Sequence, residues 1–155
     1  MSLFGFLLYV LFIPLAVLGV SQWLDTYYSK KGNIWWLVVA CLLFSLSYFL
    51  PSPAIHGHET QFMTHVVGGG IFCGFLWMYH RSKLTSVPYV WYWELVGLFA
   101  LTSLLGTLNE LYELFAFEVL GSMPVQDTSY DLLANTLGML VFFVVYKLVL
   151  HTSRK

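Results

Sequence analysis

Charged residues are scarce in this chain. Of its 155 residues, 10% are Asp, Glu, Lys or Arg and 59% are hydrophobic, and the mean hydropathy is +0.75. An ordinary soluble domain carries about 25% charged residues, so this composition excludes a water-soluble globular core. The formal net charge of −1 offers no basic patch, and we expect no nucleic-acid partner.

Cysteine is scarce as well. The only two, Cys41 and Cys73, both lie inside apolar stretches, where a small and soft side chain commonly packs as a buried thiol. We therefore predict neither a disulfide nor a metal site at these residues. Low-complexity tracts and long linkers are also missing, so residues 1–155 are predicted to form a single integral membrane domain.

What the chain has in abundance is long apolar stretches. Five can be marked, at about 3–24, 34–50, 62–79, 95–117 and 132–150. Each is close to the roughly 20 residues that a helix needs to cross the hydrocarbon layer of a membrane. Backbone groups must hydrogen-bond within each such segment because the bilayer core holds no water. The sequence thus predicts an all-α, polytopic bundle of about five transmembrane helices.

The basic residues give this bundle an orientation. All seven fall on alternate sides of the apolar stretches: Lys30, Lys31, Arg81, Lys83, Lys147, Arg154 and Lys155. Lys and Arg concentrate in cytoplasmic loops, so five spans with the N-terminus outside and the C-terminus in the cytoplasm satisfy all of them. The first span lacks a basic start and a clear cleavage pattern, and we interpret it as a retained helix. We expect a multi-pass protein of the plasma (inner) membrane, in contact with its lipids.

Polar residues inside the spans gather near the opposite, outer side. His65 lies about one turn inside the third span, Glu110 and Glu113 lie in the outer half of the fourth, and Asp131 and Asn135 open the fifth. Three separate segments thus bring polar groups to one depth. Ionisable groups at membrane depth cost several kcal/mol unless they pair or face a wet cavity, which makes them candidates for function.

Glu110 and Glu113 share one helical face, where two carboxylates repel unless a cation, a proton or a histidine lies between them. A divalent metal of unknown identity satisfies that need, with His65, Glu110 and Asp131 as ligands. Glu113 then serves as general base and Asn135 as an orienting or oxyanion-contacting group. This predicts a metal-dependent hydrolase or transferase acting on a lipid or lipid-linked headgroup in the outer leaflet.

Several alternatives remain open from the residues alone. Thr128 and Asp131 have the spacing of a helix-capping box, which would leave Asp131 to backbone amides. His65 alone can hydrogen-bond across helices. The whole cluster can also be a non-catalytic network that holds the helices or receives a headgroup, or a proton or cation transport site. His56 and His58, in the loop before the third span, are further candidate ligands.

Small residues recur on the third span. Gly68, Gly69 and Gly70, followed by Gly74, place small residues four apart, the spacing that allows helices to approach closely. We expect these faces to pack against other helices, and a homo-oligomer through Gly-rich helix faces is one form of that packing.

Two motifs resemble those of known families. Residues 127–138, with Asp131-Leu-Leu-Ala-Asn135 followed by Gly138, resemble the last-helix signature of VanZ-like membrane proteins. Glu110-Leu-Tyr-Glu113, together with the paired Asp127 and Asp131, is more similar to the related YjdF-like family. The resemblance covers about residues 61–145.

The resemblance implies a function, and this chain departs from the family pattern at one position. Better-known VanZ-like proteins are associated with glycopeptide resistance, which implies a role in the cell envelope or in headgroup binding. Both families also place an acidic residue one turn before the histidine that matches His65, whereas this chain has Gln61 there. Either Glu59 substitutes for that acid or its role is absent here.

Overall fold

A computed structural model gives the fold of residues 3–55, 58–81, 83, 90–120 and 128–153. In these residues the chain forms five helical rods. They are α1 (Leu3–Tyr28), α2 (Ile34–Ser47), a continuous rod of α3 (Phe62–His65), η1 (Val66–Ile71) and α4 (Phe72–Arg81), then α5 (Trp91–Leu120) and α6 (Thr128–Ser153). The expected all-α bundle is confirmed.

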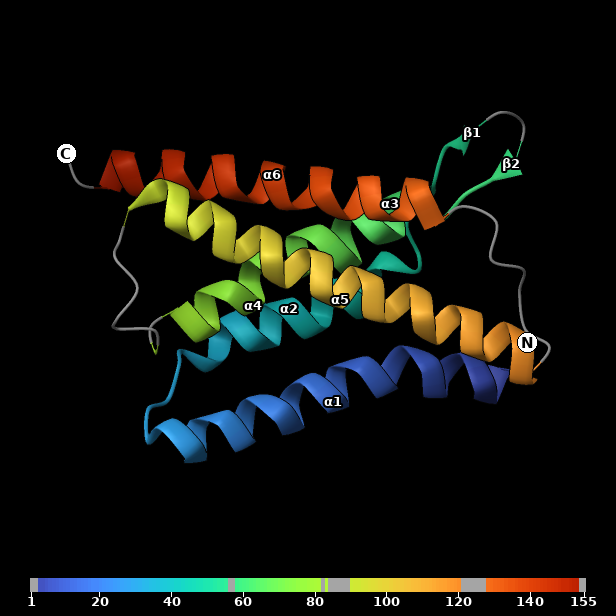
Figure 1. The fold of residues 1–155 in the computed structure, drawn as a ribbon, viewed down its shortest axis with the longest axis horizontal. Coiled ribbons are helices and arrows are strands. Elements are labelled where there is room, and N and C mark those ends of the chain that lie inside the picture. The colour runs from blue at the N-terminus through green and yellow to red at the C-terminus, as the bar shows by residue number, and fades with distance from the viewer. Residues whose placement is uncertain (1–2, 56–57, 82, 84–89, 121–127, 154–155) are drawn as a thin grey trace.

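The rods run back and forth along the bundle, so the two chain termini lie at opposite ends (Figure 1). One end, which we call the basic end, holds the ends of α1, α4 and α6 and the start of α5. The other holds a short antiparallel hairpin of β1 (Ala54–Ile55) and β2 (His58–Glu59), and we call it the hairpin end. The assignment of the basic end to the cytoplasm stays a prediction from the positive-inside rule.

Four helical segments in the described residues are long and apolar enough to cross a membrane: Val10–Tyr28, Phe62–Arg81, Trp91–Phe115 and Thr128–Val149. The chain is therefore a membrane protein. The second rod, α2, is shorter than expected, with 14 residues that span about 21 Å at a rise of about 1.5 Å per residue. It stops at Ser47 rather than at residue 50, and Phe49 and Leu50 donate instead to the carbonyls of Leu46 and Ser47 in tight turns. Pro51 then drives Leu50 out of the helical region, so the helix does not resume.

The buried core lies where α2, the third rod, α5 and α6 meet. It contains Leu37, Ala40, Phe44, Phe72, Cys73, Leu76, Trp77, Tyr79, Leu98 and Met139. Cys73 is a buried free thiol in this core, and Cys41 is also a free thiol. Large apolar side chains of α1, α5 and α6 instead cover the outside of the bundle, the arrangement that lipid contact favours.

Glycine allows the third rod to press against α6. Residues Val66–Ile71 form a π-helical turn, and a Cβ added at Gly70 would lie 2.5 Å from the Met139 backbone nitrogen and closer still to the Asn135 carbonyl oxygen. At Gly69 a Cβ would overlap the Asn135 side-chain oxygen. These glycine faces are thus covered by helices of the same chain, while the predicted homo-oligomer stays a prediction.

Gly70→Ala is expected to destabilise the protein by about 1–3 kcal/mol, because the added methyl meets backbone atoms of α6 that cannot rotate away. Gly19→Ala is the matched control, since a Cβ at Gly19 has no neighbour within 4 Å. Thermal unfolding of the two variants in detergent measures the difference. Equal melting temperatures would contradict the close packing of η1 on α6.

Candidate functional site

At the hairpin end, three ionisable side chains from two rods converge. His65, Glu110 and Glu113 each offer one ligand atom, and these atoms lie within 4.8 Å of one another. His65 and Glu110 are buried and Glu113 is half-buried. His65 lies at the junction of α3 and η1, and the two glutamates lie one turn apart on α5, as their spacing predicts.

Asp131 reaches the same cluster from α6. Its Oδ1 lies 3.4 Å from Nε2 of His65, and both side chains are buried. Thr128 is the first helical residue of α6, and Asp131 faces His65. This contact favours a role in the cluster over the helix-capping interpretation.

Amide side chains flank the carboxylates. Asn109 Nδ2 donates a hydrogen bond of 2.7 Å to Glu113 Oε1, which fixes one oxygen of that carboxylate. Asn135 is 4% exposed, and its Oδ1 accepts no hydrogen bond from the residues that the structure describes. A buried amide oxygen without a donor is costly, and a ligand at this point can supply one.

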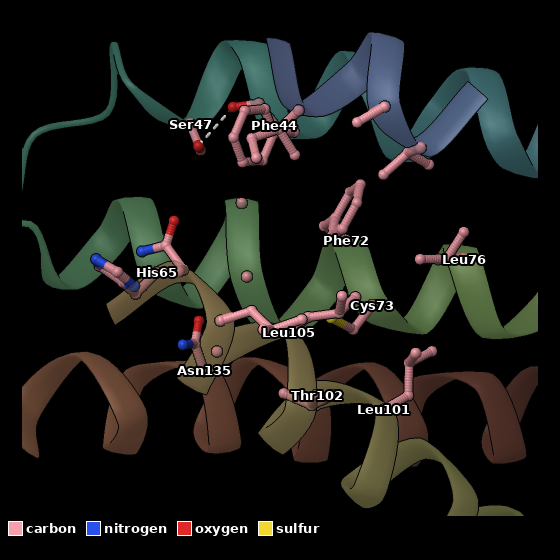
Figure 2. Close-up of a pocket in the computed structure, with 18 of the residues that line it drawn as sticks. Phe44, Ser47, His65, Phe72, Cys73, Leu76, Leu101, Thr102, Leu105 and Asn135 are labelled. Carbon is pink, nitrogen blue, oxygen red and sulfur yellow. Dashed lines mark hydrogen bonds between the residues drawn. The ribbon is translucent and has the colours of Figure 1, made fainter. Parts of the chain in front are cut away.

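The cluster opens onto a cavity of about 600 Å³ that reaches into the bundle (Figure 2). Sites for small molecules typically measure about 300–1,000 Å³. The wall is apolar over most of its length, with Phe72, Leu76 and Leu101 among its residues, whereas His65 and Asn135 lie together at one end. Glu113 also lines the cavity, but Glu110 and Asp131 are not among its lining residues.

The five predicted site residues are thus brought together at one end of the bundle and divided into two groups. His65, Glu113 and Asn135 line the cavity, whereas Glu110 and Asp131 lie behind its wall, with Asp131 Oδ1 3.4 Å from His65 Nε2. His56, Asp127 and the side chains of His58 and Glu118 fall outside the described residues. The structure therefore does not place them relative to the cluster.

The basic end holds a second charged cluster, which the sequence analysis did not anticipate. Glu94 is 2% exposed and accepts hydrogen bonds from Arg81 Nε at 3.3 Å and from Lys147 Nζ. Arg81, expected in a loop, is the last residue of α4 and is 3% exposed. Each of these two charges is buried against an opposite one.

Asp25 organises the other half of this cluster. It accepts hydrogen bonds from Lys83 Nζ and, at 2.6 Å, from Tyr79 Oη. Ser21, one turn earlier on α1, lies 3.3 Å from His80 Nε2. The sequence does contain a signal for these pairs. Asp25 lies near the end of one apolar stretch and Glu94 at the start of another, and both are on the side predicted for Lys and Arg.

The fold and site define the class of protein: a helical membrane protein with a buried His–carboxylate cluster at one end of an apolar cavity. Comparison with protein-family models, with curated proteins and with solved structures finds no match for the chain. The resemblance to VanZ-like and YjdF-like proteins accordingly remains a prediction that depends on its short motifs.

Proposed function

We propose that the protein is a membrane-embedded, metal-dependent enzyme that hydrolyses or transfers a lipid or lipid-linked headgroup. The observation that carries this proposal is the convergence of His65, Glu110 and Glu113, whose ligand atoms lie within 4.8 Å of one another. Of these three, His65 and Glu113 also line the cavity, so a cation held here lies beside the space in which a substrate binds. A relationship to the VanZ-like and YjdF-like families is part of the proposal and depends on the motifs alone.

His65, Glu110 and Asp131 are the proposed ligands. Imidazole nitrogen and carboxylate oxygens suit several divalent metals, Zn²⁺ and Mn²⁺ among them. A divalent cation also removes the repulsion between Glu110 and Glu113, whose ligand atoms lie within 4.8 Å of each other and of His65. When bound, such a metal lowers the pKa of water and polarises an ester or phosphoryl oxygen.

Glu113 is the proposed general base. It lines the cavity, is less buried than Glu110 and has its Oε1 fixed by Asn109. In hydrolysis Glu113 takes one proton from water as the oxygen attacks the ester or phosphoryl centre, and returns it to the departing alcohol. Asn135, on the same wall, contacts the oxygen on which negative charge develops.

Metal binding is the first test. At a tenfold excess of Zn²⁺ or Mn²⁺ over its dissociation constant, we expect the purified protein to gain about 1.4 kcal/mol of stability, and to lose it with a chelator. Glu110→Gln should abolish this gain. His80→Gln is the control, because His80 lies at the far end of the same rod and its hydrogen-bonding ability is kept.

Elemental analysis of the wild-type protein accompanies the stability measurement. If neither metal co-purifies and neither stabilises the protein, the metal-dependent enzyme is ruled out. The alternative would then be a non-catalytic network, which the 3.4 Å contact between His65 and Asp131 favours because it links two rods without a metal. In that case Glu110→Gln would change stability equally with and without chelator.

A further inference from the structure

The apolar part of the cavity is longer than a headgroup requires. His65 and His80 both line it and are 15 residues apart on one rod, which corresponds to about 22 Å at a rise of about 1.5 Å per residue. One leaflet contributes about 15 Å to the hydrocarbon layer. The cavity therefore has room for a hydrocarbon chain that starts at the cluster and extends along the bundle.

The cavity is open on one side, between α1 and α5. Ala16 of α1 and Leu105 of α5 both line it, yet among the described residues α1 packs its backbone only against α2. The polar contacts that tie α1 to the third rod are made by Ser21 and Asp25, near its C-terminal end. Phe12 of α1 and Leu108 of α5 line the cavity and are each 52% exposed, so between these two helices the cavity faces the surroundings of the bundle, which in a membrane are lipid chains.

We propose that this cavity is a binding site for one acyl chain of a membrane lipid, which enters sideways between α1 and α5. The apolar wall excludes a polar ligand along most of its length, because each unpaired polar group there would lose its hydrogen bonds to water. The polar end at Glu113 and Asn135 then receives the linkage between chain and headgroup. This last step rests on the proposed function, whereas occupancy by the chain does not.

The site is tested with a photoreactive lipid. The full-length protein is reconstituted in phosphatidylglycerol vesicles that contain a trace of the same lipid with a diazirine at the end of a palmitoyl chain. After irradiation, mass spectrometry of peptides maps the adducts. We expect them at the basic end of the cavity, on Leu76 and Trp77, several-fold above those on Val141 and Val145, which are exposed on the outside of α6.

Two pairs of variants separate the cavity from the outer surface. Ala16→Trp and Leu108→Trp place a large side chain on positions that line the cavity and should each lower the cavity adducts several-fold. Leu15→Trp and Leu104→Trp introduce the same side chain on exposed positions of the same helices that do not line the cavity and should leave the adducts unchanged. Adducts confined to the outside of the bundle, or insensitive to both cavity variants, would overturn the acyl-chain site.

Glu110→Gln distinguishes the failure of this site from the failure of the proposed function. The acyl chain contacts the apolar wall rather than Glu110, so cavity adducts should persist in this variant even though metal binding is lost. A protein that binds metal but shows no cavity adducts would contradict the acyl-chain site alone. A protein that shows cavity adducts but binds no metal would contradict the metal-dependent enzyme alone.

Discussion

Glu94→Ala is expected to destabilise the folded protein by about 3–5 kcal/mol, the cost of removing one partner from a buried ion pair. Glu94 is 2% exposed and holds two cations, Arg81 from α4 and Lys147 from α6. Without the carboxylate, Arg81 remains buried and loses its ion pair with Glu94. The measurement is the thermal unfolding of the purified variant, with size-exclusion chromatography to report the folded fraction.

A double variant shows whether the loss of stability in Glu94→Ala comes from the buried Arg81 cation that has lost its carboxylate. In Arg81→Met with Glu94→Leu, no buried charge remains in this pair, and replacement of a buried ion pair by apolar residues is often neutral. Lys147 is about one-third exposed and can extend its ammonium toward the surface. We expect stability close to that of the wild type, and a double variant as unstable as Glu94→Ala would contradict this account.

Glu113→Gln is expected to lower turnover about 10²–10⁴-fold, because glutamine keeps the shape of the side chain but accepts no proton from water. Turnover is followed as headgroup or fatty acid released from the lipids of reconstituted vesicles, by mass spectrometry. Metal content and melting temperature should stay near those of the wild type, since His65, Glu110 and Asp131 are unchanged. Wild-type turnover in this variant would end the proposed role of Glu113.

Asn109→Ala is the companion variant. It removes the 2.7 Å hydrogen bond to Glu113 Oε1 but leaves the carboxylate in place. We expect a smaller loss of turnover than in Glu113→Gln, because the base is present but no longer held in one orientation. If Glu113→Gln instead loses its metal together with its activity, Glu113 is a ligand rather than the base.

The sequence predicts the hairpin-end cluster because membrane depth can be counted along each span. His65, Glu110, Glu113, Asp131 and Asn135 follow from the rise per residue and the alternating direction of the helices. What counting does not give is the direction in which each side chain points. Only the packing of α5 and α6 on η1 separates Glu113, on the cavity wall, from Glu110 behind it.

The burial of charge at the basic end does not follow from the sequence for a related reason. The positive-inside rule describes which side of a membrane Lys and Arg occupy, and says nothing of whether they are solvated. Arg81 and Lys83 lie at the basic end, where Glu94 and Asp25 hold them inside the bundle. The cavity also depends on contacts between distant helices, and no local pattern in the sequence encodes it.

The π-helical turn at Val66–Ile71 sets the phase between the two ends of the third rod. A π turn contains one residue more than a regular turn, and each residue advances an α-helix by about 100°. Deletion of one glycine there would restore an uninterrupted α-helix and rotate one half of the rod against the other. Either His65 would leave Asp131 or Arg81 would leave Glu94, so the extra residue lets one span serve both clusters at once.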